Sequence, residues 1–236
     1  MDSNAEHKQR FQEKVGAHLD TVIDVYVFLI PARIRALLGD FVTWSKIYER
    51  LPGVTLKGAL TPYRIRSQSP AAMAYIPTDL FALRNVLRYV GPEDVFVDLG
   101  CGKGRVLCFV AGRRKLKKVL GVEIVPELAQ IARRKVANSR LLTPVEVIEG
   151  DAAKADLNEG TVFYLFNPFG EKTLRKVLSN IETSLSSNPR GIRILYYNPR
   201  CADVLDNTPW LQPSIEEDRR LEKEVRGRLR VRMWHN

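Results

Sequence analysis

The chain has few of the residues that build metal sites, disulfides and histidine-based catalytic sites. Among its 236 residues these are Cys101, Cys108, Cys201, His7, His18 and His235. No cysteine pair has C-x-x-C spacing, and the histidines all lie near the chain ends, so we expect no metal site and no histidine triad. Three cysteines cannot form a complete disulfide framework either. This favours a reducing compartment, and we expect a cytoplasmic location.

Long hydrophobic runs are also missing. The most apolar early run spans only residues 25–30, whereas a membrane-spanning helix needs about 20 apolar residues. Residues 1–14 mix acidic and basic side chains around no apolar centre, which is unlike a signal peptide. We therefore expect neither a signal peptide nor a transmembrane segment.

Positive charge is plentiful, with 37 Lys and Arg against 27 Asp and Glu, a formal net charge of +10. Such a balance suits acidic partners in general, but residues 1–60 contain no recognisable nucleic-acid module, so nucleic acid is possible and not favoured. Near the C-terminus, Arg226, Arg228, Arg230 and Arg232 alternate with other residues. On a strand they would make one cationic face, which contacts either a partner or solvent.

The hydrophobic pattern changes along the chain and predicts two parts. Residues 1–74 predict a helical extension with a connector, and residues 75–236 predict the main domain. In the second part short apolar runs alternate with amphipathic helices, which is typical of βαβ units around a parallel sheet. We expect strands at 95–97, 119–122, 145–148, 162–166 and 192–197, helices at 78–90, 103–113, 126–136 and 174–185, and two strands after Ser214 joined near 226–227.

A glycine-rich loop, DLGCGKG from Asp98 to Gly104, follows the first predicted strand and precedes a helix. Glycine permits positive φ and lets a ligand approach the backbone, whose N–H groups can bind it at the helix N-terminus. The strand-end carboxylate of Asp98 would repel a pyrophosphate but attract an ammonium group. Unlike the G-x-G-x-x-G dinucleotide fingerprint, the third glycine comes one residue early and Arg105 follows it.

Polar residues also end the next three predicted strands. Glu123 is placed to accept hydrogen bonds from a ribose diol, and Asp151 from an adenine amino group, although Gly150-Asp151 is also a common turn sequence. Asn167-Pro168-Phe169 ends the fourth strand. Its amide oxygen could accept a hydrogen bond from an amine nucleophile, and Phe169 could line that site or contact a methylated product. The alternative is a plain turn.

Taken together, these residues resemble the class I S-adenosylmethionine-dependent methyltransferases over roughly 75–236. The resemblance implies a Rossmann-like doubly wound, seven-stranded, mostly parallel α/β sheet with an antiparallel last strand. It also implies S-adenosyl-L-methionine as the cofactor. Asn167-Pro168-Phe169 looks like the N/D-P-P-Y/F motif of amino-group enzymes, but with one proline and then Gly170. The cofactor-binding residues implied are Asp98, Gly100, Gly102, Gly104, Glu123, Asp151 and Ala152.

Just upstream, Tyr75-Ile76-Pro77-Thr78 is similar to a loop of two seven-strand lysine methyltransferase groups, which implies that Tyr75 and Thr78 line the cofactor. We therefore expect methyl transfer to an amine, either a protein lysine or a small molecule, with Asn167, Pro168 and Phe169 at the acceptor. Two alternatives remain, a catalytically inactive cofactor-binding module and a nicotinamide-dependent oxidoreductase.

Overall fold

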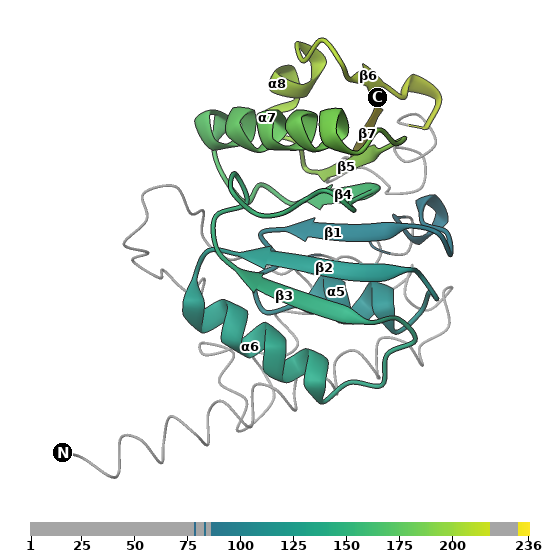
Figure 1. Ribbon diagram of the computed structural model, residues 1–236, viewed down its shortest axis with the longest axis vertical. Coiled ribbons are helices and arrows are strands. Elements are labelled where there is room, and N and C mark those ends of the chain that lie inside the picture. The colour runs from purple at the N-terminus through teal and green to yellow at the C-terminus, as the bar shows by residue number, and fades with distance from the viewer. Residues whose placement is uncertain (1–77, 79–82, 84–85, 218–230) are drawn as a thin grey trace, which may run out of the picture. The chain divides into compact units, whose positions relative to one another are not determined.

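A computed structural model of the chain describes residues 78, 83, 86–217 and 231–236, which form a seven-stranded sheet with helices on both faces (Figure 1). The strands are β1 (Val95–Leu99), β2 (Lys118–Glu123), β3 (Val145–Glu149), β4 (Val162–Leu165), β5 (Arg193–Tyr197), β6 (Gln212–Pro213) and β7 (Val231–His235). The helices are η1 (Leu87–Tyr89), α5 (Arg105–Ala111), α6 (Pro126–Ala137), α7 (Glu171–Ser187) and α8 (Ala202–Asp206). The predicted extension at 1–74 and Tyr75 lie outside the described residues.

The strand order is β3-β2-β1-β4-β5-β7-β6. Strands β1 to β5 run parallel, and β7 is antiparallel to both β5 and β6. The predicted doubly wound, mostly parallel sheet with an antiparallel last strand is thus confirmed. Within the described part of the chain, no helix is both long enough and apolar enough to cross a membrane.

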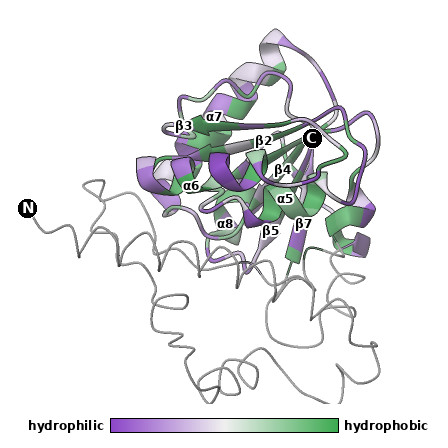
Figure 2. Ribbon diagram, turned by 90° about the horizontal axis from the view of Figure 1, so that it is seen from below, coloured by the Kyte–Doolittle hydropathy of each residue, from purple (hydrophilic) through white to green (hydrophobic). Residues whose placement is uncertain are grey.

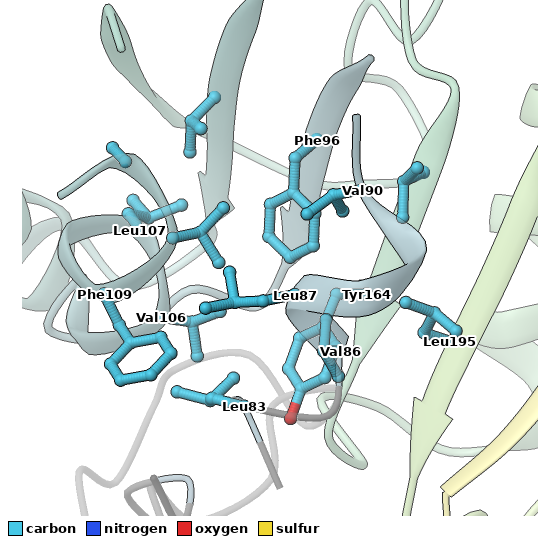
Figure 3. Close-up of a cluster of buried hydrophobic side chains, with 14 of the residues drawn as sticks. Leu83, Val86, Leu87, Val90, Phe96, Val106, Leu107, Phe109, Tyr164 and Leu195 are labelled. Atoms are coloured by element: carbon cyan, nitrogen blue, oxygen red, sulfur yellow. The ribbon is translucent and has the colours of Figure 1, made fainter. Parts of the chain in front are cut away.

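Both faces of the sheet are covered, which explains why the central strands are continuous apolar runs. On one face η1 and α5 pack against Phe96 and Tyr164, and Figure 3 shows Leu87, Val106 and Phe96 pointing into that layer. On the other face, α7 and α8 pack against a second set of buried side chains from the same strands. Figure 2 shows the hydrophobic colours concentrated on the strands in the middle of the domain.

The direction of winding reverses between β1 and β4. Strands β2 and β3 lie on one side of β1, whereas β4 and β5 lie on the other. In open α/β sheets, ligands bind outside the carboxyl ends of the strands at such a reversal. Gly100 follows β1 directly, and Asn167 follows the end of β4 by two residues, so both flank this point.

The C-terminal segment corrects one prediction. Two strands were expected after Ser214, but β6 ends at Pro213 and residues 215–217 are helical. Ser214 and Glu217 have the S-x-x-E spacing typical of a helix start, and this local signal outweighs the weak strand pattern. The final strand is present as β7, while the predicted junction near 226–227 lies outside the described residues.

Arg232 binds within the protein. Its guanidinium donates to both carboxylate oxygens of Asp206 at 2.9 and 3.0 Å, and it lies 4.5 Å from the ring centroid of Trp234. Trp234 Nε1 donates to the same carboxylate at 2.9 Å. The Arg232 hydrogen bonds lower the pKa of Asp206. Arg232 therefore links β7 to α8. The other three arginines of the predicted cationic face lie outside the described residues.

Another arginine, Arg190, joins three segments that position β4 and β5. Its guanidinium donates five hydrogen bonds, which reach the carbonyls of Leu157, Gly160, Ser184 and Asn188 and the Ser184 hydroxyl at 2.7 to 3.2 Å. A carbonyl that is buried on folding without a hydrogen-bond donor carries a desolvation penalty, because it has lost its bond to water. Arg190 thus satisfies the end of α7 and the turn before β4.

We expect Arg190→Ala to lower the unfolding free energy by about 2–3 kcal/mol, because several half-buried carbonyls lose a charged donor at once. This corresponds to a decrease in melting temperature of about 5–10 °C for a domain of this size. Calorimetry should show the decrease, with only partial recovery in Arg190→Lys, because an ammonium lacks the fork of donors. Arg175→Ala is the matched control: its exposed pair with Glu171 is worth about 0.5 kcal/mol or less. Equal losses in both variants would contradict this role for Arg190.

Candidate functional site

The glycine loop links β1 to α5 through three left-handed residues. Gly100, Gly102 and Gly104 have φ values of 83°, 53° and 71°, which glycine adopts without the steric penalty of a Cβ. The loop is fixed to β2, because the N–H groups of Gly100 and Cys101 both donate to the Val122 carbonyl, at 2.8 and 3.0 Å. The loop therefore has a defined shape at the carboxyl end of the sheet.

Close packing requires glycine at two of these positions. A Cβ on Gly104 would lie 3.0 Å from the Cβ of Ala132, so this residue permits the approach of α5 to α6. A Cβ on Gly100 would lie only 2.4 Å from the Cβ of Pro168. The loop after β1 is therefore in direct contact with the loop after β4, across the point where the winding reverses.

Asp98 lies beneath this loop with 2% of its surface exposed. Its Oδ2 has no hydrogen-bond partner among the described residues. Burial raises the pKa of the Asp98 carboxyl well above its ordinary value, and the nearby negative charge of Glu123 raises it further. A buried carboxylate without a full set of partners is costly unless a cation meets it. This chemistry fits the ammonium group of S-adenosylmethionine.

Glu123, the last residue of β2, is held by two backbone donors. Its Oε2 accepts from Gly102 N at 2.8 Å and its Oε1 from Val125 N at 2.9 Å. Burial raises the pKa of this carboxyl, and the backbone hydrogen bonds partly offset the effect. A carboxylate has about four acceptor positions, so both oxygens retain capacity for the two hydroxyls of a ribose.

The loop after β3 is a turn in which Asp151 Oδ1 accepts from Ala153 N at 2.9 Å. Ala152 is buried, and Asn180 of α7 donates to the carbonyls of Ala152 and Ala155, at 3.2 and 2.9 Å. Sequence reasoning did not single out Asn180, because its role depends on where α7 packs. It also passed over Ile124, an apolar side chain that is 36% exposed beside Glu123 and suits contact with a base. Its position could have been predicted from the sequence, because Ile124 is an apolar residue directly after Glu123, the acid at the end of a strand.

The loop after β4 is oriented toward β5 by the side chain of Asn167, whose φ is 44°. Asn167 Nδ2 donates to the carbonyl of Asn198 at 2.7 Å. Its Oδ1 accepts from the Tyr196 hydroxyl at 2.9 Å and from Arg200 N at 3.3 Å. The amide oxygen expected to meet an amine thus already accepts two hydrogen bonds from the β5 end.

The remaining predicted residues have different surroundings. Pro168 and Phe169 are half-buried, and Phe169 packs against the hydrophobic layer under α7. Thr78 is buried with 6% exposure, while its predicted neighbour in the site, Tyr75, lies outside the described residues. Asp98 is the second-last residue of β1, Glu123 ends β2, and Asp151 and Asn167 follow β3 and β4. All four therefore lie near the carboxyl ends of parallel strands.

Comparison with known proteins gives a family for this arrangement. Residues 96–188 match a family described as a methyltransferase domain. A protein-lysine N-methyltransferase of Saccharolobus islandicus is 31% identical over 94 residues, which cover 39% of this chain and 58% of that protein. A histone-lysine N-methyltransferase, H3 lysine-79 specific, of Caenorhabditis elegans is 44% identical over 48 residues, 20% of this chain and 5% of that protein.

A third relative, from Methanobrevibacter smithii, is named as a probable cobalt-precorrin-6B C(15)-methyltransferase (decarboxylating). It is 28% identical over 144 residues, 52% of this chain and 75% of that protein. The first two relatives are thus matched over 58% and 5% of their own length. Residues 96–188 thus match a methyltransferase domain, and the strand order and the glycine loop after β1 agree with the Rossmann-like fold that the sequence predicts for such a domain.

Proposed function

We propose that this protein transfers a methyl group from S-adenosylmethionine to an amine, with a protein lysine as the first candidate and a small-molecule amine as the second. The observation that carries the proposal is the contact between Gly100 and Pro168. It brings the candidate cofactor loop and the candidate acceptor loop together at the winding reversal, where α/β sheets bind their ligands.

The chain's own residues would bind and orient the cofactor, which supplies the activated methyl group on its sulfonium. In this proposal Asp98 meets the ammonium group, Glu123 the ribose hydroxyls, and Asp151 with Ala152 the adenine. The glycine loop approaches the cofactor through its backbone, and Tyr75 and Thr78 line the methionine end. Alignment of donor and acceptor in such a site can contribute several kcal/mol to lowering the barrier.

Three observations support an aliphatic amine as the acceptor. An Asn-Pro-Phe sequence follows β4 at Asn167, and two of the relatives are named as lysine methyltransferases. In addition, Asn167 Oδ1 already accepts two hydrogen bonds. The exocyclic amino group of a nucleobase, whose lone pair is conjugated with the ring, would depend on a free acceptor oxygen more than an aliphatic amine does. In the proposed site Phe169 and the loop backbone guide a neutral amine, and nucleic acid is not favoured.

Incubation of cell extract with S-adenosylmethionine carrying a labelled methyl group tests this proposal. We expect label in protein, on lysine, with the wild-type chain and none above background with Asp98→Ala. Label confined to small molecules would support the second candidate. Cofactor binding without any transfer would indicate a partner module, and binding of NAD in place of S-adenosylmethionine would indicate an oxidoreductase. Either of these last two results would refute the proposal.

A further inference from the structure

The same dipeptide follows two neighbouring strands. Asn167-Pro168 comes after β4, and Asn198-Pro199 after β5. Asn167 and Asn198 have φ values of 44° and 49°, and among the described residues no other non-glycine residue has a positive φ. This conformation is costly without glycine, and it persists where the surroundings impose it. The two strained residues lie beside each other, since Asn167 Nδ2 donates to the Asn198 carbonyl.

The orientation of the Asn167 amide follows from its partners. Arg200 N can only donate and the Asn198 carbonyl can only accept, so Oδ1 must face the first and Nδ2 the second. The Tyr196 hydroxyl then donates to Oδ1 at 2.9 Å, which is shorter than the 3.3 Å from Arg200 N. Tyr196 therefore supplies the shorter of the two hydrogen bonds that hold this oxygen toward β5.

Tyr196 is suited to a constant structural hydrogen bond. Its side chain lies in the layer under α7 and α8 with 1% exposure. Burial raises the pKa of its hydroxyl to about 12, so the group keeps its proton and remains a donor at neutral pH. Tyr196 sits on β5, inside the sheet, which makes it a rigid support for the loop after β4, where Asn167 has a positive φ.

We infer that Tyr196 is a positioning residue for the acceptor site. Its hydroxyl orients Asn167, Asn167 sets the course of the chain into Pro168, and Pro168 rests on Gly100 of the cofactor loop. The inference rests on the proposed function, in which the loop after β4 faces the transferred methyl group. The tyrosine acts through Asn167 and its loop, and it touches neither cofactor nor acceptor itself.

Calorimetric titration of Tyr196→Phe with two ligands tests the inference. S-adenosylhomocysteine occupies the cofactor side alone, whereas sinefungin carries an amine on carbon in place of the methylsulfonium and so extends toward the acceptor loop. We expect the dissociation constant for S-adenosylhomocysteine to change by less than about twofold. For sinefungin we expect the affinity to fall by about five- to tenfold, which corresponds to the loss of about one hydrogen bond.

Tyr89→Phe is the matched control. Its hydroxyl donates to Glu217 Oε2 at 2.8 Å, and its carbonyl accepts from Arg193, the first residue of β5, at the end of the strand opposite to Asn198. This variant loses a hydroxyl hydrogen bond of similar length, and both dissociation constants should stay at the wild-type values. Selective loss of sinefungin affinity in Tyr89→Phe as well would overturn the assignment to Tyr196.

A second variant addresses the same hydrogen bond from the other side. Asn167→Gly keeps the left-handed backbone accessible and removes the amide. We expect at least the same selective loss, because the variant removes the Tyr196 hydrogen bond together with those to Arg200 N and the Asn198 carbonyl. Adding Tyr196→Phe should cause no further loss, because its hydroxyl has then already lost Asn167. Additive losses, or equal weakening of both ligands, would overturn the inference alone. A wild-type protein that binds neither ligand would overturn the proposed function and the inference with it.

Discussion

Gly100→Ala is expected to weaken the binding of S-adenosylmethionine by at least tenfold. The new methyl group would lie 2.4 Å from Pro168 Cβ, whereas non-bonded carbons prefer about 3.5–4.0 Å. The backbone at φ 83° is also unfavourable for alanine, by about 1–2 kcal/mol. With overpacking costs of about 1–3 kcal/mol, the loop must move away from the loop after β4. Titration calorimetry should show at least a tenfold loss, roughly 1.4 kcal/mol.

Gly191→Ala is the control for this substitution. Gly191 has no neighbouring atom within 4 Å of an added Cβ, its φ is not positive, and it lies before β5 at the opposite end of that strand from the site. We expect its affinity for S-adenosylmethionine to equal that of the wild type. If Gly100→Ala bound the cofactor as tightly as Gly191→Ala, the loop after β1 would not be the cofactor site.

Asp98→Asn should weaken S-adenosylmethionine binding by about 2–3 kcal/mol, or roughly 30- to 150-fold, because the ligand's ammonium group loses a buried anionic partner. The same substitution removes a carboxyl whose Oδ2 has no partner among the described residues. We therefore expect no comparable loss of stability in the ligand-free protein. A variant that loses affinity and retains its melting temperature has lost a ligand contact rather than a structural one.

The pH dependence of binding follows from the same carboxyl. In the ligand-free protein, burial raises the pKa of Asp98, so it holds a proton to higher pH than usual. A nearby ammonium group favours the ionised form and lowers that pKa. Binding therefore releases a proton, and affinity should rise with pH until it passes the raised pKa of the free protein, then level off. Calorimetry in two buffers of different ionisation enthalpy measures the release.

Two further variants make this prediction specific. Asp203→Asn removes an exposed carboxylate of α8 and should change neither affinity nor proton release. Glu123→Gln should weaken binding but retain proton release, because the pKa of Asp98 is raised chiefly by burial, which this substitution leaves in place. Wild-type binding that neither releases protons nor weakens in Asp98→Asn would show that Asp98 does not meet the ammonium group.

Local patterns were sufficient for most of the fold. The apolar runs that became β1 and β4 are buried on both faces, and the periodic helix α7 buries Leu174, Val177 and Ile181 on one side. These signals are strong because the hydrophobic pattern of an element's own residues indicates which of its faces are buried. Residues 215–217 were wrongly predicted as strand, because a short edge strand and a helix start differ by only a few side chains.

The amino-acid sequence by itself determined the residue types at the strand ends: the acids, the alternating glycines and the Asn-Pro-Phe segment. It could do so because a glycine loop between a strand and a helix is a local signature. Only the tertiary structure decided how they combine. Pro168 meets Gly100 because β1 and β4, which are 66 residues apart in sequence, pair as neighbours in the sheet. Asn167 turns toward Tyr196 because β4 and β5 also pair. No local pattern encodes such a contact, since it depends on the order in which the strands assemble.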